Sequence, residues 1–208
     1  AILEDGDFLR GNDPDLRERI IHWRGWSAGA SSVHDRALRR IETEAKRIMR
    51  QLDRGRPFDG RCVDEELAGI LLLSAYPDRA GRLTRGAGAE KARFLLANGR
   101  GAFAAGALAE EEFIVAADLD GGASDGRIFL AAPVARKDLE SGKAGKVQDA
   151  IEITWNGWKP GARTVRRVRS IVLSERQGGA IDDGAIDDGI VRKIQKEGLQ
   201  SLPWSESS

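Results

Sequence analysis

The chain has 208 residues, of which 41% are hydrophobic, so it is long enough for one large domain or two small ones with ordinary cores. Its 33 lysines and arginines balance 33 aspartates and glutamates. This balance excludes a globally basic, histone-like binder, although a local basic patch can still attract phosphates. The single cysteine, Cys62, excludes an intramolecular disulfide and a multi-thiolate metal site. No secretory signal and no apolar run of about 18 residues is present, so we expect a cytoplasmic protein without a membrane partner.

The first third of the chain has the spacing of amphipathic helices. Apolar residues recur at helical intervals from Asp15 to Arg24 and from Val33 to Leu52. Asp64 can cap a third helix, because its carboxylate can accept hydrogen bonds from the unpaired N–H groups of a first turn. We therefore predict a helical domain over residues 1–88, with a glycine-rich linker at residues 81–89 between it and the next unit.

Beyond residue 88 the pattern changes to the period of β-strands. Apolar residues occupy every second position of Phe113–Leu119, and Gly121-Gly122 bounds a turn before the next apolar run. Five strands are predicted, at about 93–103, 112–120, 127–134, 149–156 and 163–174. A short helix at 136–141 is predicted between the third and the fourth of them.

Five strands with a helix between the third and the fourth is the order of an oligonucleotide-binding (OB) barrel, in which a closed sheet has no free edges. We therefore predict an α+β fold. In this fold the helical domain at residues 1–88 is followed by a five-stranded OB-fold domain over residues 89–178. A C-terminal helical segment over residues 179–208 completes the chain.

The last predicted hairpin is rich in cations. Asn156-Gly157 favours a turn, and residues 159–176 hold six cations against the one carboxylate of Glu175. Cations beside an aromatic ring suit a sequence-tolerant single-strand binder, because phosphates are neutralised while a base stacks on the ring. The candidate nucleic-acid contacts in this hairpin are Trp158, Lys159, Arg163, Arg166, Arg167 and Arg169.

A structural explanation of the same hairpin stays open. Charged residues protect the edge of a sheet from aggregation, so the cations could serve that purpose alone. Strand parity also puts Arg163, Arg167 and Arg169 on one face and Arg166 on the other, which would divide the patch unless a bulge realigns it.

A second group of candidate nucleic-acid contacts is Arg93, Asn98 and Arg100. The alternative is that Asn98-Gly99 is only a turn or a bulge, in which glycine supplies backbone freedom. Asp118 and Asp120 resemble a paired-carboxylate site, but no nucleophile, base or metal cluster accompanies them, so we name no catalytic residue and no metal ligand.

The duplicated sequence Ala-Ile-Asp-Asp-Gly at residues 180–189 lacks the ligand order and the distal glutamate of an EF-hand loop. We interpret it as a helix start, in which Asp187 or Asp188 caps a helix over Ile190–Glu197.

Five short sequences stand in an order and at a spacing that resemble the C-terminal half of HrpB-type bacterial DExH-box helicases, over roughly residues 16–204. They are Ala75-Tyr76-Pro77-Asp78-Arg79, Asn98-Gly99-Arg100-Gly101, Ala116-Ala117-Asp118-Leu119-Asp120-Gly121, Val172-Leu173-Ser174-Glu175-Arg176 and Leu202-Pro203-Trp204. The resemblance implies a helical ratchet domain followed by an OB barrel. In that family both follow RecA-like motor domains, which use ATP and Mg²⁺.

The motor itself is not in this sequence. No G-x-x-x-x-G-K-[ST] loop or DExH motif occurs, so nothing here can cradle phosphates and hold their Mg²⁺. We expect a fragment without cofactors or a catalytic motif, which grips single-stranded RNA or DNA and contacts the motor domains of the same polypeptide. The alternative is a protein-docking module with little nucleic-acid contact.

Overall fold

The computed structural model describes residues 1–5, 9, 13–30, 32–52, 63–86, 90–121, 125–180 and 182–202. The chain divides into two compact units. Unit 1 comprises Ala1–Gly145 with Arg169–Ile171, and unit 2 comprises Lys146–Val168 with Val172–Ser208. Cys62, the predicted boundary at residue 88 and the Pro203-Trp204 end of the helicase-like pattern lie outside the described residues.

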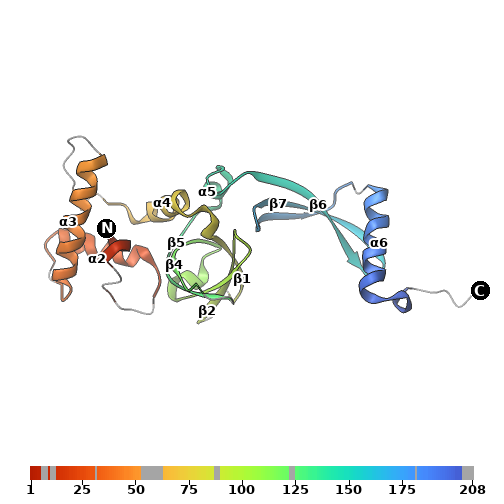
Figure 1. Ribbon diagram of the computed structural model, residues 1–208, viewed down its shortest axis with the longest axis horizontal. Coiled ribbons are helices and arrows are strands. Elements are labelled where there is room, and N and C mark those ends of the chain that lie inside the picture. Colours follow the sequence, from red (N-terminus) through yellow and green to blue (C-terminus); the bar gives the residue numbers. More distant parts are fainter. Residues whose placement is uncertain are drawn as a thin grey trace, which may run out of the picture. The chain divides into compact units, whose positions relative to one another are not determined.

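Unit 1 begins with helices (Figure 1). They are α1 (Ile2–Asp5), α2 (Leu16–Ser27), α3 (Asp35–Leu52), the 3₁₀ turn η2 (Glu65–Leu67), α4 (Ala68–Ala75) and the 3₁₀ turn η3 (Pro77–Arg79). The predicted cap at Asp64 is present, since its carboxylate accepts a hydrogen bond from the N–H of Glu66. Asp15 caps α2 in the same way, by accepting from the N–H of Arg17. α2 and α3 share a small apolar core, whose buried members are Trp23, Leu38 and Ile41.

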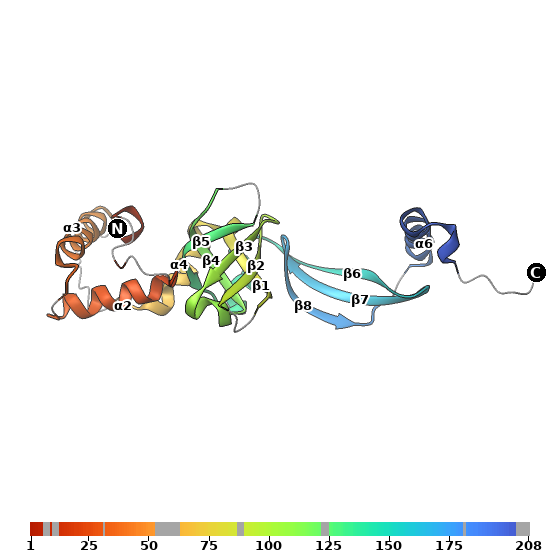
Figure 2. The same ribbon diagram turned by 90° about the horizontal axis from the view of Figure 1, so that it is seen from below.

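The centre of unit 1 is a closed five-stranded barrel (Figures 1 and 2). Its strands are β1 (Ala80–Arg85), β2 (Lys91–Leu96), β3 (Gly101–Ala105), β4 (Phe113–Leu119) and β5 (Gly126–Pro133). The order around the barrel is β1-β2-β3-β5-β4, with β3 and β5 parallel and the other pairs antiparallel. The 3₁₀ turn η4 (Gly106–Glu110) lies between β3 and β4. This arrangement confirms the predicted α+β fold with an OB-type barrel.

Small and apolar side chains fill the interior of the barrel, and β2 shows the alternation of a barrel strand most clearly. In β2, Ala92, Phe94 and Leu96 are buried, whereas Lys91 and Arg93 reach the surface. Many of the buried positions are alanines, which suits a narrow barrel because small side chains from facing strands can meet without voids.

The strands that form the barrel differ from the predicted ones. Residues 93–103 form two strands, because Gly99 turns the chain with a φ of +87° and the N–H of Leu96 donates to the carbonyl of Arg100. The segment from residue 81, predicted as a linker, contains β1, which pairs with both β2 and β4. The strands predicted at 149–156 and 163–174 belong to a separate sheet. Which strands belong to the barrel depends on pairing between residues far apart in the sequence, and the local pattern of apolar residues does not contain this information.

Helix α4 packs closely against the barrel. A Cβ atom added at Gly69 would lie 1.8 Å from the carbonyl oxygen of Pro133 at the end of β5, so only glycine permits this approach. The following helix α5 (Arg136–Glu140) confirms the short helix predicted at 136–141.

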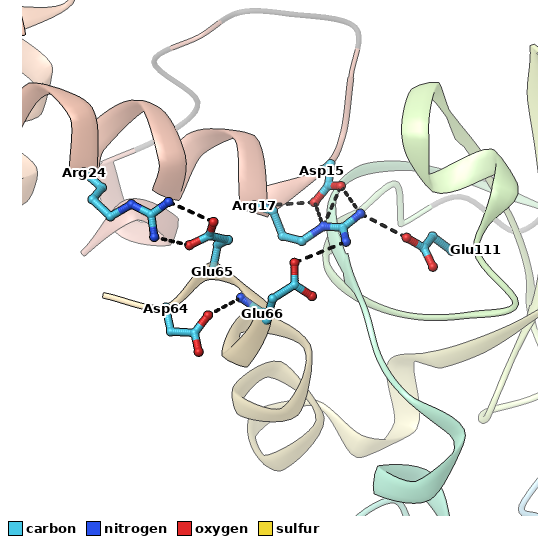
Figure 3. Close-up of polar contacts among 7 residues, drawn as sticks. All are labelled: Asp15, Arg17, Arg24, Asp64, Glu65, Glu66 and Glu111. Atoms are coloured by element: carbon cyan, nitrogen blue, oxygen red, sulfur yellow. Dashed lines mark hydrogen bonds and ion pairs between the residues drawn. The ribbon is translucent and has the colours of Figure 1, made fainter. Parts of the chain in front are cut away.

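A group of ion pairs links α2, η2 and the barrel (Figure 3). The guanidinium of Arg17 contacts Asp15 at 2.7 Å, Glu111 at 3.0 Å and Glu66 at 3.8 Å. The hydrogen bond with Asp15 raises the pKa of Arg17 above its ordinary value. The side chain of Asp15 is only 3% exposed, so Arg17 compensates a carboxylate that has lost most of its hydration.

Unit 2 contains a three-stranded sheet and a helix (Figure 2). The elements are β6 (Val147–Asn156), β7 (Lys159–Val168), β8 (Ile171–Gln177), α6 (Asp183–Glu197) and the 3₁₀ turn η5 (Leu199–Ser201). The predicted cap of the last helix was wrong, because Asp182 caps α6 by accepting from the N–H of Ala185. Within the described ranges, no helix combines the length and the apolar character needed to cross a membrane.

We expect Gly69→Ala to lower the free energy of unfolding by about 1–3 kcal/mol or more, because the new methyl group forces α4 away from β5. Gly25→Ala is the matched control, since no atom lies within 4 Å of its added Cβ. That control should instead gain up to about 1 kcal/mol from helix propensity. Urea unfolding measures both, and equal stability of the two variants would contradict the packing of α4.

Arg17→Ala should lower the free energy of unfolding by about 2–3 kcal/mol, because it leaves the buried Asp15 carboxylate without its charged partner. Arg47→Ala is a suitable comparison, since Arg47 pairs with Glu44 on the exposed side of α3, where an ion pair is worth at most about 1 kcal/mol. A loss no greater for Arg17 than for Arg47 in urea unfolding would show that the links in Figure 3 do not support the fold.

Candidate nucleic-acid interface

A row of cationic and aromatic side chains crosses three neighbouring strands on the outside of the barrel. Arg93 of β2 pairs with Phe103 of β3, and Phe103 pairs with Arg127 of β5. Their neighbours along the strands are buried or small, so strand alternation turns these three residues outward. Phe129 is the next outward residue of β5, and the guanidinium of Arg127 lies 5.4 Å from its ring centroid. The exposed fractions of Phe103 and Phe129 are 36% and 45%.

A cavity of about 630 Å³ lies beside this row, and we call it the barrel groove. Its lining residues are Glu90, Lys91, Phe103, Ala104, Ala105, Asp120, Asp125, Arg127 and Ile128. It thus combines an aromatic wall, two cations and three carboxylates. Base stacking and phosphate neutralisation are both chemically possible there, but the carboxylates reduce the positive field.

Arg93 is the candidate residue that the structure assigns to this face. Its Nε and Nη2 atoms donate to the two carboxylate oxygens of Asp125 at 2.7 and 3.1 Å. The hydrogen bond raises the pKa of Arg93 and lowers the pKa of Asp125. The guanidinium therefore already holds an anion in the bidentate geometry that it would use for a phosphate.

Asn98 and Arg100 lie in the turn between β2 and β3. The side-chain oxygen of Asn98 accepts a hydrogen bond from the N–H of Arg100 at 3.0 Å, so Asn98 performs the ordinary role of an asparagine in a turn. This agrees with the alternative that the turn is structural. Contact of either residue with nucleic acid stays a prediction.

The arginines of the predicted basic hairpin are paired with carboxylates of the same sheet. Arg163 donates to Glu152 at 2.6 Å and to Glu175 at 2.8 Å, and Arg167 also contacts Glu152. Arg166 lies on the opposite face, 3.7 Å from Asp149. The predicted division of these arginines between two faces is therefore present, and the local excess of positive charge is smaller than the sequence of the hairpin implies.

The other three candidates of this hairpin differ in their surroundings. Trp158 is half-buried, its indole N–H donates to the carbonyl of Ser201, and the ammonium of Lys193 lies 5.2 Å from its ring centroid. Lys159 is exposed at the start of β7. Arg169 lies in the β7–β8 turn with a φ of +51° and donates to the carbonyl of Ala144. Contact of these three residues with nucleic acid is also untested.

Sequence reasoning identified only Arg93 in the cationic and aromatic row. Phe103 stands between Ala102 and Ala104, and Arg127 and Phe129 alternate with Ile128. An aromatic residue at the outward parity of a strand was therefore a usable signal. It was missed because residues 93–103 were assigned to one strand, which obscured the register.

Neither a protein-family model nor a curated protein matches this sequence. Two solved structures of HrpB from Escherichia coli do match in three dimensions. One, a DExH-box NTPase, has a TM-score of 0.58 and 24% identity. The other, described as a DEAH/RHA helicase, has a TM-score of 0.56 and 18% identity. Both matches cover 99% of this chain and 23% of the other.

At these identities the match establishes the fold, and the chain spans less than a quarter of the length of either structure. The helical region, the closed barrel and the C-terminal sheet with its helix are all included in a match of such coverage. The chain has the fold of a segment of the HrpB DExH-box helicase, as the resemblance in its sequence predicts.

Proposed function

We propose that this chain is an accessory, nucleic-acid-guiding segment of an ATP-dependent RNA helicase. In this proposal it grips a single strand while RecA-like motor domains of the same polypeptide hydrolyse ATP with Mg²⁺. Two findings support the proposal: the fold likeness to a segment of HrpB and the OB-type order of the barrel strands. OB barrels commonly bind oligonucleotides on the face formed by their second and third strands.

The observation that carries the proposal is the row Arg93–Phe103–Arg127 on that face. A base that stacks on Phe103 would have a guanidinium on the strand at either side. Stacking on an aromatic ring is worth about 1–3 kcal/mol per base and tolerates any base, while arginines neutralise the adjoining phosphates. The row therefore has the two components that a sequence-tolerant single-strand binder needs.

The basic hairpin is a weaker candidate for the same role. Because Arg163, Arg166 and Arg167 each have a carboxylate partner in their own sheet, a phosphate would have to compete with that partner. In the row, Arg93 is paired in the same way with Asp125, whereas Arg127 lies over the ring of Phe129. The proposed path of the strand therefore runs over the barrel, and the hairpin makes at most a secondary contribution.

A docking role is the second candidate function, and one feature of α4 favours it. Leu67 and Leu71 are 51% and 66% exposed one helical turn apart, whereas Leu72 and Leu73 on the same helix are buried. The motor domains of the same polypeptide are the proposed partner of this apolar pair. If docking is the main role, Leu71→Glu should abolish binding of the separately expressed motor domains and leave single-strand affinity unchanged.

Phe103→Ala should weaken binding of a labelled single-stranded RNA by about 5- to 150-fold, the equivalent of about 1–3 kcal/mol of stacking. Its logarithmic salt dependence should stay the same, because stacking releases no counterions. Fluorescence anisotropy across a salt series measures both quantities. Leu71→Ala removes an exposed apolar side chain outside the groove and is the matched control. Equal affinities of the two variants would overturn the barrel path.

Substituting the cations of the groove should change the salt dependence most. Lys91→Ala with Arg127→Ala should flatten the logarithmic slope by up to about 1.4, or roughly 0.7 for each lost phosphate contact. Arg163→Ala with Arg167→Ala removes the same charge from the hairpin and should flatten the slope less, because the carboxylates of Glu152 and Glu175 already pair with these two arginines. If the hairpin variant flattens the slope more than the groove variant does, the nucleic-acid path lies over the hairpin and not over the barrel.

A further inference from the structure

The ion pair between Arg93 and Asp125 spans an intervening strand. Arg93 belongs to β2 and Asp125 immediately precedes β5, and β3 lies between these two strands in the barrel. The pair fits there because β3 has a glycine at that point. A Cβ atom added at Gly101 would lie 1.8 Å from Oδ1 of Asp125 and 2.6 Å from Nη2 of Arg93. Because Gly101 has no side chain, the space above its backbone is open, and the two side chains meet there.

We infer that Asp125 is an internal competitor for the phosphate that Arg93 would bind, and that it limits the affinity of the barrel groove for nucleic acid. This inference rests on the proposed function. The carboxylate occupies both donors of one edge of the guanidinium, at 2.7 and 3.1 Å, as a bidentate phosphate oxygen pair does. A single strand must therefore displace Asp125 before Arg93 can hold a phosphate.

The exposure of the pair suits this role better than a role in stability. The side chains of Arg93 and Asp125 are 33% and 31% exposed, so an incoming phosphate can reach the guanidinium. Ion pairs that remain in contact with water contribute little to folding, because the charges lose little by separating. The stability of the fold therefore depends little on this ion pair. The affinity for a ligand that binds Arg93 depends on it directly, because the ligand has to displace Asp125.

The competition persists over the whole neutral pH range. The hydrogen bond from Arg93 lowers the pKa of Asp125 below its ordinary value, so the carboxylate stays charged wherever nucleic acid is bound under ordinary conditions. Asp125 is also one of three carboxylates that line the groove, with Glu90 and Asp120. Its two oxygens hold Arg93 of the row.

Two substitutions remove the competitor in different ways. Asp125→Asn deletes its charge. Gly101→Ala keeps every charge and separates the pair sterically, since the atoms that the new methyl group meets are the ends of two flexible side chains. Both variants should bind a labelled single-stranded RNA several-fold more tightly than the original chain. Asp125→Asn should also steepen the logarithmic salt slope by up to about 0.7, the value of one additional phosphate contact.

Matched controls isolate the contact from general effects. Glu110→Gln removes one negative charge from an exposed position of η4, and Gly121→Ala adds a methyl group with no atom within 4 Å. Glu110→Gln should raise the affinity less than Asp125→Asn does, and Gly121→Ala should raise it less than Gly101→Ala does. The gain of Asp125→Asn should disappear when Arg93→Ala is combined with it, because Arg93 is the group that the substitution releases. Urea unfolding of each variant verifies that the fold is retained.

The outcomes separate this inference from the proposed function. If Phe103→Ala weakens binding while Asp125→Asn and Gly101→Ala leave it unchanged, the internal competitor is overturned and the barrel path stands. A second result would also overturn the inference: Glu110→Gln raises the affinity as much as Asp125→Asn does, and Gly101→Ala does not raise it. The gain in affinity would then come from the change in net charge alone. If none of the groove variants, including Phe103→Ala, alters binding, both the inference and the proposed path fail.

Discussion

Closure of the barrel is the constraint on which the rest of unit 1 depends. The β1–β4 and β3–β5 pairings join the ends of the sheet, so alternate side chains of every strand must enter a narrow interior. Alanines fill much of that interior, and the intervening residues face outward, as Lys91 and Arg93 do in β2. The outward row of Arg93, Phe103 and Arg127 is thus a consequence of closure and register, as is the position of Gly101 beneath the ion pair of Arg93.

Charge pairing decides which basic residues are available to a ligand. The hairpin of unit 2 has more arginines than the barrel groove, but Glu152 alone contacts two of them. Such pairs contribute at most about 1 kcal/mol each to stability at an exposed site. Their larger consequence is for ligands, since each pair cancels a charge that would otherwise attract a phosphate. A local cation count therefore overstates the positive charge that the hairpin presents, and it takes no account of the groove, in which Arg127 lies over an aromatic ring.

The helices were predicted well because their signals are local. Asp64 caps the turn that leads into α4, and the apolar stripe of α3 follows the helical period over its whole length, so a short window of sequence contains the necessary information. The turn at Gly99 was only an open alternative, because residues 93–103 were predicted as one strand. β1 carried no comparable signal: two of its six residues are arginines and one is a glycine, and it is a strand because β2 and β4 both pair with it. Strand membership of that kind is a property of contacts between distant residues.

The sequence by itself therefore determined the α+β class, the cap at Asp64, the short helix before residue 141 and the resemblance to a helicase segment. Each of these depends on residues that are close together in the chain or on their order along it. Only the tertiary structure decided which five strands close into the barrel and which arginines have carboxylate partners. The reason is physical: strand pairing and ion pairing join residues far apart in sequence, such as Arg93 and Asp125. Their energies depend on a distance that exists only after folding.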